Sequence, residues 1–114
     1  IFKSNNPWLY YKTTNRKIYD YEWQDYKIQG FDEVIYCNER GELTEGSRTN
    51  IFIDFGDGKL ATPPQKCGLL NGILRQKLLE NGNAYEKILH FDDLNAAQHI
   101  YVGNSLRGLK KAFF

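Results

Sequence analysis

Residues 50–64 have the sequence NIFIDFGDGKLATPP, and this stretch decides the fold class of the chain. Asn50–Phe55 is a compact apolar run, which is typical of a buried strand. Gly56-Asp57-Gly58 predicts a hairpin turn. The strand that returns from it, Leu60–Thr62, should stop at Pro63-Pro64, because proline cannot continue a strand ladder. The stretch therefore predicts an antiparallel pair of strands.

The residues before this pair predict two more strands and one helix. Trp8–Lys12 is an aromatic strand candidate, and Glu33–Cys37 is an apolar run that we expect to precede the hairpin in an antiparallel meander. Between them, a helix capped by Thr13 or Thr14 should end near Gly30. One face of that helix would carry aromatic and aliphatic residues of the core, namely Ile18, Tyr19, Trp23 and Tyr26.

The residues after the hairpin predict an alternation of helices and strands. Asn71 is the expected N-cap of a helix that ends at a left-handed Gly82. Its apolar stripe would be formed by Ile73, Leu74, Leu78 and Leu79. The remaining expected elements are a strand over Lys87–Phe91, a short helix from an Asp92 cap through Gln98, and a last strand over Ile100–Val102. The prediction for residues 1–114 is a single α/β domain with mixed strands.

Composition excludes several classes of function. The 114 residues carry a net charge of +1, with 41% apolar and 25% charged residues, which is ordinary for a globular domain. A nucleic-acid grip would need a basic face, and a membrane span would need an apolar run of about 20 residues; we expect neither. His90 and His99 lack metal-ligand spacing, so we expect no metal site.

Two further features of the chain concern its setting. Cys37 and Cys67 lack CxxC spacing, and we expect them to be thiols in a reducing cytoplasm. The chain begins with Ile1 and contains no Met, so we expect it to be a piece of a longer protein.

Four segments of the chain are candidates for chemistry. Residues 68–75, GLLNGILR, place two glycines at a helix start, where free N–H groups could hold an anion, although many such turns are only turns. Lys12 ends an aromatic strand, where a desolvated lysine could act as a nucleophile, and the alternative is an ordinary surface lysine. Glu45, in the polar loop Thr44–Asn50, and the loop Asn104–Gly108 follow the pattern in which α/β proteins build sites at strand ends.

Together these segments resemble the fold-type IV, or class IV aminotransferase, family of pyridoxal-phosphate enzymes. The resemblance runs from about Tyr11 to Arg107, and four ordered motifs carry it: KTTNR (12–16), NERGELTEGSRTNIF (38–52), TPPQKCGLLNGILR (62–75) and GNSLRG (103–108). In the residues of these motifs, the chain is most similar to the aminodeoxychorismate lyase branch of the family. The resemblance implies the C-terminal, cofactor-binding domain of this family, with mixed strands in a pseudo-barrel flanked by helices. The N-terminal domain of the family is expected to be missing.

The resemblance also implies roles for individual residues in binding pyridoxal 5′-phosphate. Lys12 matches the lysine that forms a Schiff base with the cofactor, and Glu45 matches the acid that bonds the pyridine nitrogen. Leu70 matches the apolar residue on the ring face. Gly72 precedes Ile73 and Leu74, which match the positions whose N–H groups bind the phosphate.

Four further positions are implied around this set. Asn104 matches a polar position that also reaches the phosphate, and its neighbour Ser105 lies near phosphate or substrate. Arg48 is expected to serve the phosphate or a substrate carboxylate. Arg16 lies where some relatives place a tyrosine near the ring hydroxyl. For both arginines the alternative is a structural ion pair.

The implied reaction is proton removal by Lys12 followed by elimination, which converts 4-amino-4-deoxychorismate to para-aminobenzoate and pyruvate in folate synthesis. The alternatives are a class IV aminotransferase acting on branched-chain or D-amino acids, and a non-catalytic domain. The resemblance further implies a small-molecule substrate, a cytoplasmic homodimer, and a chain that could be fused to a para-aminobenzoate synthase domain.

Overall fold

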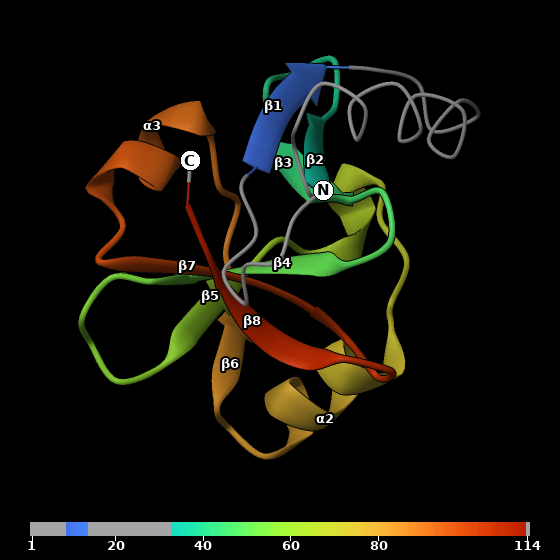
Figure 1. Cartoon of the computed structure of the whole chain (residues 1–114), viewed down its shortest axis with the longest axis vertical. Helices are drawn as coiled ribbons and strands as arrows, with labels where there is room; N and C mark the ends of the chain where they lie inside the picture. Colours follow the sequence, from blue (N-terminus) through green and yellow to red (C-terminus); the bar gives the residue numbers. More distant parts are fainter. Residues whose placement is uncertain (1–8, 14–32, 114) are drawn as a thin grey trace, which may run out of the picture.

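The computed structural model describes the backbone of residues 9–13 and all of residues 33–113. Within these residues the chain is an α/β fold of short helices and two sheets (Figure 1). The elements in chain order are β1 (Leu9–Thr13), β2 (Glu33–Cys37), β3 (Leu43–Gly46), β4 (Asn50–Asp54), β5 (Leu60–Thr62), the 3-10 turn η2 (Gln65–Cys67), α2 (Ile73–Glu80), β6 (Ala84–Glu86), α3 (Phe91–Ala96), β7 (His99–Asn104) and β8 (Gly108–Ala112). The helix expected between Thr13 and Gly30 falls outside the described residues.

The strands form mixed sheets, which confirms the predicted class. One sheet has the order β1-β2-β3, with β1 parallel and β3 antiparallel to β2. The other has the order β6-β5-β4-β7-β8, in which only β5 and β6 are parallel. Because α2 lies between β5 and β6 in the chain, it forms the crossover that a parallel pair requires.

The core lies where apolar strand residues from both sheets meet. β4 is buried from Asn50 through Ile53, as its continuous apolar run predicts, and β2 is buried along its whole length. The central cluster is made of Ile35, Cys37, Leu43, Ile51, Ile53, Ala61, Leu89, Leu94, Ile100, Val102 and Ala112. Both cysteines are buried free thiols, in agreement with the sequence prediction. No helix in the described part of the chain is long and apolar enough to cross a membrane.

The predicted meander is confirmed in the antiparallel pair β4–β5 and is wrong in placing β2 in the same sheet as that pair. β2 pairs antiparallel with the next strand, and so does β4, but the two pairs lie in different sheets. The segment expected to be a polar loop, Thr44–Asn50, contains most of strand β3. Polar Thr44 and Glu45 can occupy a strand here because the adjacent strand and the segment after η2 supply hydrogen-bond partners for their side chains.

Strand and helix boundaries in the C-terminal half also differ from the prediction. Instead of the strand expected over Lys87–Phe91, the chain forms β6, in which Ala84–Glu86 pair with β5. The expected segment touches β3 through the Leu89 carbonyl, which accepts the N–H of Leu43. α3 begins after His90, not after Asp92, and it ends at Ala96. The carboxylate of Asp93 accepts the His90 N–H at 2.8 Å, so Asp93 caps the helix from within its first turn. Strand β8 was not predicted, because its alternating Gly-Leu-Lys-Lys-Ala sequence has little apolar character.

Helix α2 departs most from the sequence prediction. Its N-cap is Gly72 rather than Asn71, and its fully buried side chain is Arg75, whereas Ile73 is 59% exposed. The predicted stop is confirmed: Gly82 has φ +78°, and the N–H groups of Gly82 and Asn83 donate to the carbonyls of residues 79 and 78. This pattern is a Schellman motif, which favours glycine at the left-handed position.

Candidate functional site

A buried carboxylate on β3 meets the segment that leads into α2. Glu45 is 5% exposed, and its Oε1 accepts the backbone N–H of Leu70 at 3.0 Å. The Leu70 side chain itself is 68% exposed. Glu45 and Leu70 were predicted to serve one site, and the structure brings them together.

The first turn of α2 lies at the end of the same segment. The first bond of the helix runs from the Gln76 N–H to the Gly72 carbonyl at 3.0 Å. The N–H groups of Ile73 and Leu74 precede that bond and have no acceptor within the helix, so they are available to an anion. Ile73 is exposed and Leu74 half-buried, which leaves this turn open to solvent.

Asn50 holds this segment in place from β4. Its side-chain amide donates to the Leu70 carbonyl at 2.9 Å. A Cβ atom on Gly72 would lie 2.7 Å from Asn50 Oδ1, so only glycine fits between the asparagine and the helix start. The backbone between Leu70 and Ile73 is therefore tied to both β3 and β4.

The turn between β7 and β8 closes one side of the site. Asn104, at the end of β7, donates from Nδ2 to the Arg48 carbonyl at 3.0 Å, and its Oδ1 accepts the N–H groups of Leu106 and Arg107. A Cβ on Gly103 would lie 2.9 Å from Leu74 Cδ2, so this strand end packs directly against α2 (Figure 1). Ser105 is exposed at the start of the turn.

The two predicted residues nearest the N-terminus are placed less completely. Lys12 lies on β1, where its backbone pairs with Tyr36 of β2. Since β3 is the other neighbour of β2, two strand spacings, roughly 10 Å, separate the backbones of Lys12 and Glu45. Arg16 lies outside the described residues.

Two buried charged residues near the site were missed by the sequence reasoning. Glu33, at the start of β2, is 5% exposed, and Arg75 of α2 is 1% exposed. Arg75 donates to Asn71 Oδ1 at 2.7 Å, to the Pro63 carbonyl at 2.9 Å and to Glu86 Oε2 at 2.6 Å. A charged residue beside an apolar strand or on an apolar helix face was the available signal for both, although most such residues are solvent-exposed.

A titratable cluster pins the β2–β3 turn to η2, away from the helix start. The Asn38 side chain donates to Glu42 Oε1 at 2.9 Å, and this bond holds the pKa of Glu42 below its usual value. Burial, together with the nearby Glu42 carboxylate, raises the pKa of the Cys67 thiol to about 11. A thiol with this pKa is neutral at physiological pH, so the cluster is structural in character.

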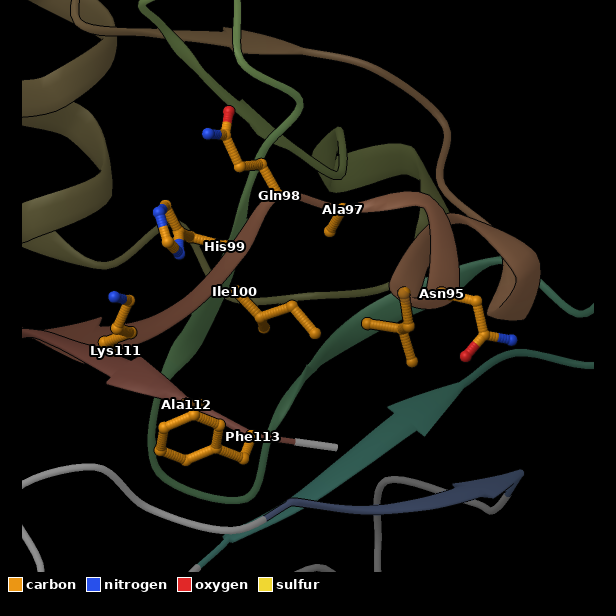
Figure 2. A pocket seen from close by; sticks show the side chains of 9 residues that line it. Asn95, Ala97, Gln98, His99, Ile100, Lys111, Ala112 and Phe113 are labelled. Carbon is orange, nitrogen blue, oxygen red and sulfur yellow. The ribbon is translucent and has the colours of Figure 1, made fainter.

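A separate hollow of about 430 Å³ lies between α3, the start of β7 and the end of β8 (Figure 2). Figure 2 shows its polar and apolar walls, which include Asn95, Gln98, His99, Ile100, Lys111 and Phe113. Asn104 lies at the opposite end of β7, roughly 17 Å along the strand, so this hollow is not part of the site above. Among the described residues, no three His, Cys, Asp or Glu side chains gather as metal ligands would.

The arrangement around Leu70 suits a flat, anionic heteroaromatic group. The α2 start offers hydrogen-bond donors to a phosphate, Glu45 offers a carboxylate to a ring nitrogen, and the exposed Leu70 offers an apolar surface for a ring face. Pyridoxal phosphate carries a phosphate, a ring nitrogen and an apolar ring face, so these groups fit the cofactor that the sequence resemblance implies.

Comparisons with known proteins agree with this geometry. A family model described as amino-transferase class IV matches residues 1–111. A Schizosaccharomyces pombe protein named "Putative aminodeoxychorismate lyase" is 33% identical over 111 residues, which cover 93% of this chain and 48% of that protein. The chain thus spans about half the length of this curated relative.

Solved structures share the fold. The "Putative amino-acid aminotransferase" of Mesorhizobium loti is 41% identical with a TM-score of 0.85, covering 98% of this chain and 61% of the other. The branched-chain amino acid aminotransferase of Escherichia coli is 19% identical with a TM-score of 0.78, covering 97% and 44% respectively, and this likeness concerns the fold alone. The motifs, the site geometry and the family match together establish that the chain belongs to the class IV aminotransferase family of enzymes.

Proposed function

We propose that this chain binds pyridoxal 5′-phosphate and forms the cofactor-holding part of an aminodeoxychorismate lyase. The observation that carries the cofactor proposal is the convergence of three groups: the first turn of α2, the buried Glu45 carboxylate and the exposed Leu70 side chain. Glu45 comes from a distant part of the chain, and packing does not explain the convergence, since the side chains of Leu70 and Ile73 remain exposed.

Each residue has a defined task in this proposal. The N–H groups of Ile73 and Leu74 bind the phosphate at the positive end of the helix dipole. Glu45 pairs with the ring nitrogen, and Leu70 orients the ring through its apolar face. Asn104 keeps the β7–β8 turn against Arg48, close to the helix start.

Lys12 is the proposed catalytic residue. The bound cofactor supplies an acceptor for the negative charge that develops when a proton leaves the amine-bearing carbon of the substrate. In its neutral form, Lys12 takes that proton and acts as the general base. Arg48 and Ser105 are the proposed substrate contacts, and a carboxylate is the group that Arg48 would recognise.

The lyase reaction, release of pyruvate and formation of para-aminobenzoate, is favoured by the fission-yeast relative, because the similarity extends over almost the whole chain. An amino-acid aminotransferase is the alternative, and the 41% identity to the Mesorhizobium structure favours it. The expected homodimer, the fusion to a para-aminobenzoate synthase domain and the cytoplasmic location stay predictions.

Product analysis separates the two reactions. The full-length protein is incubated with aminodeoxychorismate and pyridoxal phosphate in the absence of a keto acid. A lyase releases pyruvate and para-aminobenzoate in equal amounts. Amine transfer that requires an added keto acid, without pyruvate release, would replace the lyase proposal by the aminotransferase alternative.

The assigned lysine is tested independently of turnover. Borohydride reduction of the cofactor-loaded protein followed by peptide mapping should place the label on Lys12. Lys12→Ala should abolish the visible absorption of the bound cofactor, and Lys66→Ala, an exposed lysine of η2, should leave it unchanged. A label on another lysine would show that the assignment is wrong.

A further inference from the structure

The buried carboxylate of Glu33 accepts five hydrogen bonds, four of them from a single turn. Oε1 accepts the N–H of Val34 at 2.8 Å, the N–H of Ser47 at 2.9 Å and the Ser47 hydroxyl. Oε2 accepts the Thr49 hydroxyl at 2.9 Å and the N–H of Arg48 at 3.3 Å. An ionised carboxylate has only acceptors, so it satisfies several donors at once, and no neutral side chain of this size could replace it.

The contact between this carboxylate and the turn is too close to admit another side chain. A Cβ on Gly46 would lie 2.8 Å from Glu33 Oε2 and 2.5 Å from Thr49 Oγ1. Both distances are below van der Waals contact, so the turn can lie against the carboxylate only because residue 46 is glycine. The hydrogen bonds of the Glu33 carboxylate therefore hold the turn Ser47–Thr49 in position.

The same turn also contacts residues of the candidate site. The Arg48 carbonyl accepts the Asn104 side chain, which organises the β7–β8 turn. At its two ends the turn continues into β3, which carries Glu45, and into β4, which begins with Asn50. Glu45 and Asn50 are the residues that bond to the N–H and the carbonyl of Leu70. One three-residue turn thus connects the residues that bond to both backbone groups of Leu70.

We propose that Glu33 is a positioning residue for the cofactor site: by holding the turn Ser47–Thr49, it sets the places of Glu45, Asn50 and Asn104 around the start of α2. This inference rests on the proposed binding of pyridoxal phosphate and adds a residue to it that touches neither cofactor nor substrate. The effect travels through hydrogen bonds to the backbone of the turn. Loss of the carboxylate should therefore change cofactor binding as well as stability.

The test compares Glu33→Gln with Glu39→Gln in the full-length protein. Glutamine keeps the size of residue 33 but turns one acceptor oxygen into a donor that faces other donors. Glu39 lies exposed in the β2–β3 turn and is the matched control. The measurements are the dissociation constant for pyridoxal phosphate, the pH dependence of the absorption of the bound cofactor, and the urea midpoint of the cofactor-free protein.

We expect Glu33→Gln to weaken cofactor binding at least tenfold and to shift the pH midpoint of the absorption, because displacement of Glu45 changes the surroundings of the ring nitrogen. Glu39→Gln should change neither. A purely structural carboxylate would lower the urea midpoint and leave the absorption of the bound cofactor as in wild type, which would overturn the proposal.

A milder pair of variants covers the case in which Glu33→Gln does not fold. Ser47→Ala and Thr49→Val each remove one hydroxyl donor and keep the carboxylate. Each should weaken binding by a few fold, and unchanged binding in both would overturn the positioning role. Failure of the wild-type protein to bind pyridoxal phosphate would overturn the proposed function itself, whereas wild-type binding with unaltered variants overturns only the role of Glu33.

Discussion

Replacement of Arg75 by methionine should destabilise the chain by about 3 kcal/mol, because three acceptors lose the charged donor that bonds to them. The guanidinium is 1% exposed and joins α2 to three other places: Asn71 before the helix, Pro63 after β5 and Glu86 on β6. Methionine keeps an unbranched stem that fills much of the same space, so the change tests the polar contacts more than the packing.

The magnitude follows from the three bonds. A hydrogen bond to a charged group contributes about 1.5–3 kcal/mol, and a buried carbonyl that loses its partner costs about 1–3 kcal/mol. The three contributions are not additive, because methionine also removes the cost of burying a charge. Nε has no hydrogen-bond partner among the described residues, so its removal offsets part of the loss.

Urea unfolding followed by tryptophan fluorescence measures the effect. Glu86→Gln should cost less than about 1 kcal/mol, because Glu86 is 48% exposed and water screens its charge. Arg107→Met, at an exposed position in the β7–β8 turn, is the matched control and should change stability by less than about 0.5 kcal/mol. The reasoning is refuted if Arg75→Met is no more destabilising than this control, or if Glu86→Gln costs as much as Arg75→Met.

Three more predictions concern the same region and its surroundings. Gly72→Ala should displace Asn50, whose Oδ1 would lie 2.7 Å from the new Cβ, and should destabilise the chain by about 1–3 kcal/mol while weakening cofactor binding; an unchanged urea midpoint and dissociation constant would contradict this. The pKa of the Cys67 thiol is raised to about 11, against an ordinary 9.0, so its contribution to stability is complete below pH 9 and is lost as the pH rises towards 11. The free energy of unfolding should therefore fall over that range, and it should fall less in Cys67→Ser. In Gly82→Ala the new Cβ would have no atom within 4 Å, but alanine would be forced to φ +78°, so the variant should lower the free energy of unfolding in urea by about 1 kcal/mol. Asn81→Ala is the control, and equal stability of the two variants would show that the left-handed conformation is not needed.

Much of the sheet could be predicted because local sequence carries the necessary information. The apolar runs of β2 and β4 are buried strands whatever their partners, and Pro63 and Gly82 end their elements by backbone sterics alone. β3 could not be predicted in the same way. β3 pairs with β2, and its buried polar side chains find their partners elsewhere: the Thr44 hydroxyl donates to the Tyr36 carbonyl, and the Glu45 carboxylate accepts the N–H of Leu70, 25 residues away.

The residues of the candidate site also fall into a predicted group and a group that the sequence did not predict. The residues of the sequence motifs were enough to single out Glu45, Leu70 and the start of α2, and the structure places these three next to one another. Glu33 and Arg75 escaped prediction, because a charged side chain is normally solvated and only tertiary contacts supply the donors or acceptors that permit its burial.

The sequence by itself determined the family, the positions of the main strands and the residues proposed to bind a cofactor, because these depend on short motifs and on the apolar pattern along one segment. Tertiary structure alone decided the division of the strands into two sheets, the burial of Arg75 in place of an apolar stripe, and the support of the turn Ser47–Thr49 by Glu33. The physical reason is that a buried polar group is stable only when it is hydrogen-bonded, and its partners here come from other segments of the chain, which the local sequence does not specify.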